Sequence, residues 1–217
     1  MRIPVRFLCE HIGYRMLGSD IEVEGVRLFD GNTDNLEPHM LYIVDTGGAS
    51  AVDAMISDRS SAFLESDDAA GCLNGALKFM ERVQDWEGEV ASSLLHPDGD
   101  GLDGLMRLFS KLLGNAAYLV DSSLKVIAID DDPAFQDMSA IWRHIVRYGF
   151  IPLDIASGMQ SSGELDNLDR TKPPVLFKSD FFNNEFINCN LWVDGQLWGH
   201  LFFVGYQKKI TRGDVLM

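Results

Sequence analysis

The residues best suited to chemistry lie in two runs near the end of the chain, on either side of Asp194-Gly195. In extended strands alternate side chains share a face, so one face of these runs would carry amides and an imidazole among aromatic rings. Aromatic walls with a few polar groups are typical of small-molecule sites. With a tryptophan from an earlier helix, the predicted ligand-binding residues are Trp142, Asn188, Asn190, Trp192, Trp198, His200 and Phe202.

The opposite face of the first run is apolar and is predicted to be core: Ile187, Cys189, Leu191 and Val193. A second interpretation stays open for the polar face. Buried amides need hydrogen-bond partners, so the asparagines could pair with backbone or water while the aromatic rings fill the core or a dimer interface. If the pocket interpretation holds, replacing Trp192 should abolish ligand binding.

No pattern of catalytic or metal-binding residues stands out. The five histidines lack zinc-ligand spacing, and the chain has no nucleophile signature of the G-x-S-x-G kind. Three consecutive carboxylates, Asp130 to Asp132, suit either a metal site or the start of a helix, where negative charge complements the dipole. We favour the helix start. The sequence predicts a protein that is not an enzyme and uses no metal or cofactor.

Charge limits the partners. Asp and Glu number 33 against 18 Lys and Arg, for a net charge of −15. Phosphate backbones are bound by basic patches, so we expect no direct contact with nucleic acid. The N-terminus does not resemble a secretory signal, and no run approaches the roughly 20 apolar residues of a membrane span. Three widely spaced cysteines favour a reduced, cytoplasmic setting.

Residues 1–72 predict a small α/β domain. A helical pattern at 3–17 precedes a strand at 21–29 with a bend at Gly25, a buried strand at 41–44, a helix at 49–56 and a return strand at 60–64. A strand–helix–strand run of this length suggests a parallel pair.

Residues 73–97 predict a long connector helix. Apolar positions spaced by four and three residues form a seam with one charged interruption at Glu87: Ala76, Met80, Val83, Val90 and Leu94. Such a seam either packs on its own domain or joins two copies of the chain. Pro97 and the glycines that follow it break the helix and mark a domain boundary.

Residues 98–217 predict an α+β domain with an antiparallel sheet. The expected elements are a helix at 102–113, a hairpin at 116–129, a helix from 130 to 148, a short helix and loop at 152–169, an edge strand at 175–177, a hairpin at 186–206 and a helix capped by Thr211. This order resembles the GAF/PAS class of small sensory domains. The chain stops soon after the Thr211 cap, so we expect a piece of a longer protein.

Three phrases carry a closer resemblance: NAAYLVDSSLKVIAIDDDP, FINCNLWVDGQLWGHLFFVGY and KKITRGDVLM. They look like the sensory part of bacterial transcription regulators of the purine-catabolism-regulator (PucR) and sugar-diacid-regulator type. The resemblance implies an N-terminal input domain, a GAF-like domain and a downstream helix-turn-helix, which is absent from these residues.

The sequence therefore predicts the sensory and dimerising portion of a cytoplasmic bacterial transcription regulator. It would bind an unidentified small-molecule effector, form a homodimer and pass its signal to a DNA-binding domain outside this chain. The alternative is a ligand-binding sensor module cut from a signalling enzyme such as a kinase or cyclase. The next hundred residues would separate the two hypotheses, through a basic helix-turn-helix or a catalytic signature.

Overall fold

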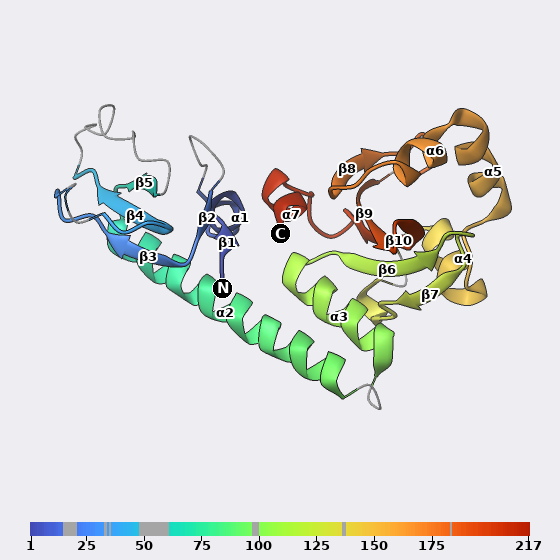
Figure 1. Cartoon of the computed structure of the whole chain (residues 1–217), viewed down its shortest axis with the longest axis horizontal. Helices are drawn as coiled ribbons and strands as arrows, with labels where there is room; N and C mark the ends of the chain where they lie inside the picture. The colour runs from blue at the N-terminus through green and yellow to red at the C-terminus, as the bar shows by residue number, and fades with distance from the viewer. Residues whose placement is uncertain are drawn as a thin grey trace. The chain divides into compact units, whose positions relative to one another are not determined.

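The structure, a computed structural model, forms two compact units (Figure 1). The first comprises residues 1–85 and 211–217, and the second residues 86–210. The described residues are 1–14, 21–32, 34, 36–47, 61–96, 100–135, 138–182 and 184–217. The expected domains, 1–72 and 98–217, thus differ from the units in that residues 211–217 group with the N-terminal part.

The first unit contains a parallel sheet, as predicted. Its strands are β3 (Gly25–Leu28), β4 (Met40–Asp45) and β5 (Ala62–Ser66), in the order β3-β4-β5. The bend predicted near Gly25 separates β3 from β2 (Glu22–Val23), which pairs antiparallel with β1 (Ile3–Pro4). The predicted first helix is shorter, α1 (Val5–His11), and the helix predicted at 49–56 lies outside the described residues.

The long helix α2 (Ala69–Leu95) contains the predicted seam and crosses from one unit to the other. Ala76, Met80 and Val83 are buried in the first unit, whereas Leu94 is 62% exposed. Within the second unit, Trp86 Nε1 donates to the Leu108 carbonyl at 2.8 Å. These contacts favour the interpretation that the first half of the seam packs on its own domain.

The terminal helix α7 (Arg212–Leu216) packs on α1 within the first unit. Thr211 and Asp214 form the predicted capping box, in which each side chain accepts a hydrogen bond from the other's backbone N–H. Gly213 N donates to Glu10 Oε2 at 2.8 Å. A Cβ on Gly213 would lie 2.7 Å from Phe7 Cα, so the close approach of the two helices requires glycine here.

The second unit is built on a five-stranded antiparallel sheet in the order β7-β6-β10-β9-β8. Its strands are β6 (Ala116–Asp121), β7 (Val126–Ile129), β8 (Val175–Lys178), β9 (Glu185–Val193) and β10 (Gln196–Val204). Both predicted hairpins and the edge position of β8 are confirmed. Asp194 and Gly195 have φ of 50° and 78°, as a two-residue hairpin turn requires.

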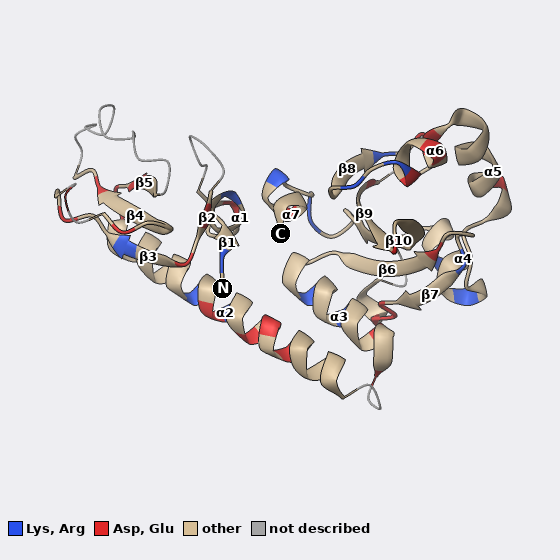
Figure 2. Ribbon diagram, viewed as in Figure 1, with Lys and Arg blue, Asp and Glu red and all other residues tan. Residues whose placement is uncertain are grey.

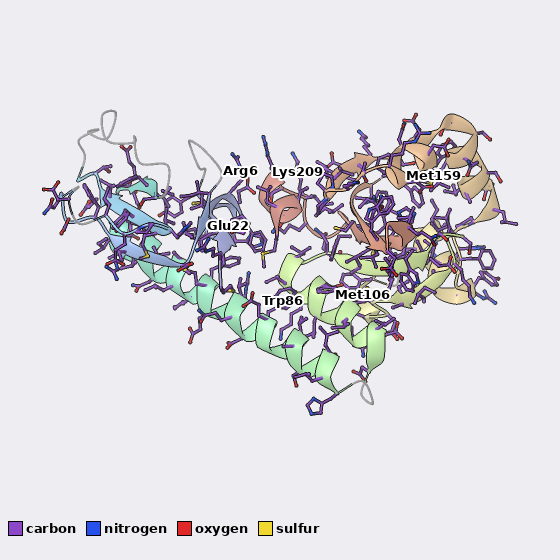
Figure 3. The ribbon with its side chains drawn as sticks, in the orientation of Figure 1. Arg6, Glu22, Trp86, Met106, Met159 and Lys209 are labelled. Carbon is purple, nitrogen blue, oxygen red and sulfur yellow. The ribbon has the colours of Figure 1, made fainter. Side chains whose placement is uncertain are left out.

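Helices cover both faces of this sheet. α3 (Gly101–Leu113) packs on β6 and β7 with Met106 buried, and the other face holds a core that includes Trp142, Met159 and Leu168. Figure 3 labels Met106 and Met159. These three come from α4 (Ala140–Tyr148), α5 (Leu153–Ser162) and α6 (Glu164–Asp169). The structure is therefore mixed α/β with an α+β second unit, in line with the expected fold class at that level.

The helix predicted from 130 to 148 is wrong in its first half. Pro133–Phe135 forms only a 3-10 turn, and α4 begins at Ala140 because the Ser139 hydroxyl accepts from Trp142 N at 3.0 Å. The carboxylates before this turn stabilise it locally. Asp130 Oδ1 accepts from Asp132 N, and Asp132 Oδ1 accepts from Ala134 N.

Figure 2 marks Asp and Glu positions along α2 and α6 in red. Lys and Arg are fewer in the chain, 18 against 33 Asp and Glu. Among the described residues, no helix has both the length and the apolar composition needed to cross a bilayer.

Candidate functional site

The structure separates the seven predicted site residues into two groups. Five lie buried or half-buried where one face of the sheet meets α4 to α6: Trp142 on α4, and Asn188, Asn190, His200 and Phe202 on the strands. Trp192 and Trp198 lie at the turn end of the β9–β10 hairpin, 39% and 44% exposed. The strand register shifts between Leu197 and Gly199, so Trp198 leaves the predicted alternation.

The polar face of β9 and β10 also carries a hydrophobic core that includes Phe186 and Phe202. Phe202 stacks on Tyr118, with ring centroids 5.1 Å apart, and Tyr118 meets Trp142 edge to face at 5.8 Å. Of the opposite face, predicted to be core along its length, Ile187 is buried and Val193 is exposed. For Trp142 and Phe202 the structure thus favours the interpretation in which aromatic rings fill the core.

Asn188, Asn190, His200 and Asp169 form what we call the polar cluster. Asn190 lies at its centre. Asn190 Nδ2 donates to the carbonyls of Leu168 at 2.6 Å and Thr171 at 2.8 Å. Asn190 Oδ1 accepts from Asn188 Nδ2 at 2.8 Å and lies 2.8 Å from His200 Nδ1. One amide therefore ties the end of α6 and the loop after it to two strands of the sheet.

The other imidazole nitrogen faces a carboxylate. His200 Nε2 lies 3.3 Å from Asp169 Oδ1, with the histidine side chain 2% exposed and the aspartate 41% exposed. Burial lowers the pKa of His200 below its ordinary value, although the Asp169 charge opposes this shift. Burial raises the pKa of Asp169, His200 opposes the rise and Asp166 adds to it. The lowered pKa of His200 and the raised pKa of Asp169 both disfavour an ion pair and favour the neutral imidazole and the neutral carboxyl group.

One hydrogen-bond acceptor in the polar cluster, Asn188 Oδ1, has no partner among the described residues. Asn188 is fully buried. A buried acceptor without a partner costs about 1–3 kcal/mol. Asn188 Oδ1 therefore has the capacity to accept a hydrogen bond from a water or a small molecule.

Two hollows lie near this core. A cavity of about 10 Å³ is lined by Tyr118, Leu124, Ile151, Met159, Phe177, Phe182, Phe186 and Phe202. That volume is about one water molecule, so the aromatic walls enclose no room for a metabolite. The expected pocket at Phe202 is therefore almost filled by its own side chains.

The second hollow is a surface groove of about 520 Å³ between the β6–β7 turn and α5, which we call the serine groove. Its lining residues are Ser122, Ser123, Leu124, Ala156, Ser157, Gln160, Ser161 and Leu165. Its volume falls within the roughly 300–1,000 Å³ typical of small-molecule sites. These residues offer hydroxyls, one amide and apolar surface, and none of them carries a charge.

Sequence reasoning missed both the serine groove and Asp169. The sequence predicts Ser122 and Ser123 only as part of the hairpin at 116–129, and residues 152–169 only as a short helix and loop. No local signal places the turn beside α5 or Asp169 beside His200, because both contacts arise from packing across the unit. Among the described residues, no group of three or more His, Cys, Asp or Glu side chains is arranged to hold a metal ion.

Comparison with family models and with curated proteins identifies no relative. No family model matches the chain, and no curated protein matches it. The resemblance to regulators of the PucR and sugar-diacid type therefore rests on the three sequence phrases alone.

Proposed function

We propose that this chain is the sensory portion of a cytoplasmic bacterial transcription regulator, and that its second unit is a GAF/PAS-like domain that binds a small effector. The observation that carries this proposal is the serine groove, which lies between the β6–β7 turn of the five-stranded antiparallel sheet and α5. Its size suits a metabolite, and its lining mixes polar groups with apolar surface as ligand sites do. The α/β first unit then serves as an input domain.

The chemistry of the serine groove suggests an uncharged polar effector. Ser123 already donates to Asp121 and Ser161 to the Ser157 carbonyl, so these hydroxyls retain their acceptor capacity. Leu124 and Leu165 offer apolar contact. A small molecule with hydroxyl or amide donors and a short apolar part would use both kinds of group, whereas a charged ligand finds no opposite charge among the lining residues.

The proposal includes a non-enzymatic role, a homodimer and no direct contact with nucleic acid. The negative net charge supports the last point. The dimer does not depend on the first half of the α2 seam, which is buried within one unit. Light scattering after size exclusion tests it, and a strict monomer at high concentration would contradict it.

Thermal-shift screening against small metabolites tests the ligand proposal, because a ligand that binds only the native state raises the melting temperature. The panel should contain uncharged polar compounds and charged analogues of similar size. Uncharged compounds are expected to raise the melting temperature of the wild-type chain.

Two variants locate the site. Ser157→Leu places a bulky side chain in the serine groove and should abolish the shift, whereas Trp192→Ala, at the exposed hairpin end, should leave it unchanged. Loss of the shift in Trp192→Ala with retention in Ser157→Leu would move the site to the hairpin and contradict the proposal. If none of the compounds raised the melting temperature, the proposal of a ligand site in the serine groove would be contradicted.

A further inference from the structure

The hydrogen bonds of the polar cluster determine where the hydrogens of His200 lie. Asn190 Nδ2 faces two carbonyl oxygens, at 2.6 and 2.8 Å, and only the NH₂ end of the amide can satisfy both. Asn190 Oδ1 must then point at His200, and this oxygen is an acceptor. His200 Nδ1 therefore carries a hydrogen and donates it to Asn190.

On the opposite side of the ring, Nε2 and Asp169 Oδ1 would both be hydrogen-bond acceptors. In a neutral imidazole with hydrogen on Nδ1, Nε2 is an acceptor, and an ionised carboxylate has only acceptors. His200 Nε2 and Asp169 Oδ1 lie 3.3 Å apart, and Asp169 Oδ1 has no hydrogen-bond partner among the described residues. Two such atoms attract each other only with a proton between them.

We propose that one proton shared by His200 Nε2 and Asp169 Oδ1 closes the polar cluster, and that its loss as the pH rises releases Asp169 from the sheet, which makes the second unit sensitive to pH. Asp169 is the last residue of α6, and its side chain is already partly exposed, so solvent can take up the released carboxylate. The inference deepens the proposed function, because it gives the sensory unit a regulatory input.

The groups that face His200 are few. α6 contributes Asp169 and, beside it, Asp166, while Arg170 at the end of that helix is exposed. The neighbouring strand β9 contributes Asn190, and the ring of Phe202 stacks on the imidazole. Tyr118 stacks on the ring of Phe202 in turn, and burial raises the pKa of Tyr118, so its phenol stays neutral. The lowered pKa of His200 and the raised pKa of Asp169 both move the shared proton toward the carboxyl group. The closed form is then an O–H of Asp169 that donates to Nε2.

Nitrogen-15 NMR of the imidazole in the whole labelled chain tests this inference, with His200→Gln used to assign the resonances. His200 Nδ1 should remain protonated from about pH 4.5 to about pH 8, a range that contains the ordinary histidine pKa of about 6.5 and lies above the ordinary aspartate pKa of about 3.9. The Nε2 resonance and the Asp169 backbone amide should shift together over that range. The measurement uses no effector, so it is independent of whether a metabolite binds the serine groove.

Asp169→Asn supplies the matched change. The asparagine amide donates to Nε2 at every pH, so the pH-dependent shift of Nε2 should be lost. Asp194→Asn, a carboxylate-to-amide change at the hairpin turn, should keep it. An Nδ1 without hydrogen, or a pH response of equal size in Asp169→Asn and the wild type, would overturn the proposal. The first of these is read from the wild-type chain, whatever the stability of the variant.

Discussion

The middle and the turn end of the β9–β10 hairpin carry the same mixture of polar and aromatic residues, yet their surroundings are opposite. In the middle, Asn188 and His200 are buried beneath the end of α6, where polar side chains need hydrogen-bond partners within the protein. At the turn end, Trp192 and Trp198 are exposed. Alternation along a strand therefore shows which residues share a face, but an element distant in sequence decides how much of that face is covered.

The largest difference between the two regions should follow loss of Asn190. Asn190→Leu keeps a similar volume and leaves the Thr171 carbonyl, Asn188 Nδ2 and His200 Nδ1 without partners. Each unpaired buried group costs about 1–3 kcal/mol, so the free energy of unfolding should fall by about 3 kcal/mol or more. Urea unfolding followed by tryptophan fluorescence measures it. Trp192→Leu, at the exposed end, should change stability by only about 0.5 kcal/mol, and equal losses would contradict the comparison.

A smaller loss of stability should follow a substitution at Gly199, which lies between the middle and the turn end of the hairpin. Gly199 lies at the register shift, and a Cβ there would meet the Val120 carbonyl oxygen at 2.2 Å. Gly199→Ala must push β10 away from β6, at a cost of about 1–3 kcal/mol. The matched change is Gly88→Ala on α2, where open space surrounds the new methyl group and alanine favours the helix. If thermal unfolding showed no difference between the two variants, the close packing at the shift would be refuted.

The smallest effect is a dependence on pH confined to the middle of the hairpin. Because the pKa of Asp169 is raised, the folded state prefers its protonated form, and ionisation destabilises the fold as the pH rises through that pKa. Asp169→Asn should therefore be more stable than the wild type by about 1 kcal/mol at pH 8, the worth of one hydrogen bond. The gain should vanish as the pH falls toward the ordinary aspartate pKa of about 3.9.

Urea unfolding across this pH range measures the difference between Asp169→Asn and the wild type. Asp194→Asn, at the exposed turn, should give no comparable gain at any pH. A constant gain for Asp169→Asn across the range would show that ionisation of Asp169 has no part in it.

Features that depend on neighbouring residues could be predicted from the sequence. Asp194-Gly195 predicted a hairpin because its residues tolerate positive φ, and Thr211 predicted a helix start because its hydroxyl reaches the N–H three residues on. The same local reasoning was wrong at Pro133. Proline is tolerated in the first turn of a helix, but the Ser139 hydroxyl is the group that caps α4.

The candidate site was harder to predict because it depends on packing between distant segments. The alternation along β9 and β10 brought Asn188, Asn190 and His200 together correctly. It could not reveal that the loop after α6 supplies the carbonyls for Asn190, or that Trp198 is displaced by a register shift. The serine groove joins a turn near residue 122 to a helix near residue 157, and neither segment has a polar pattern that points to the other.

The docking of α7 on α1 has a consequence for how the protein is made. Gly213 and Glu10, which hydrogen-bond, are 203 residues apart, and the whole second unit is synthesised between them. A ribosome adds roughly 5–20 residues per second, so α1 waits many seconds for its partner helix. During that time the face of α1 that later packs against α7 remains uncovered by that helix. The first unit to emerge is thus the last to be completed, and the second unit has the opportunity to fold before it.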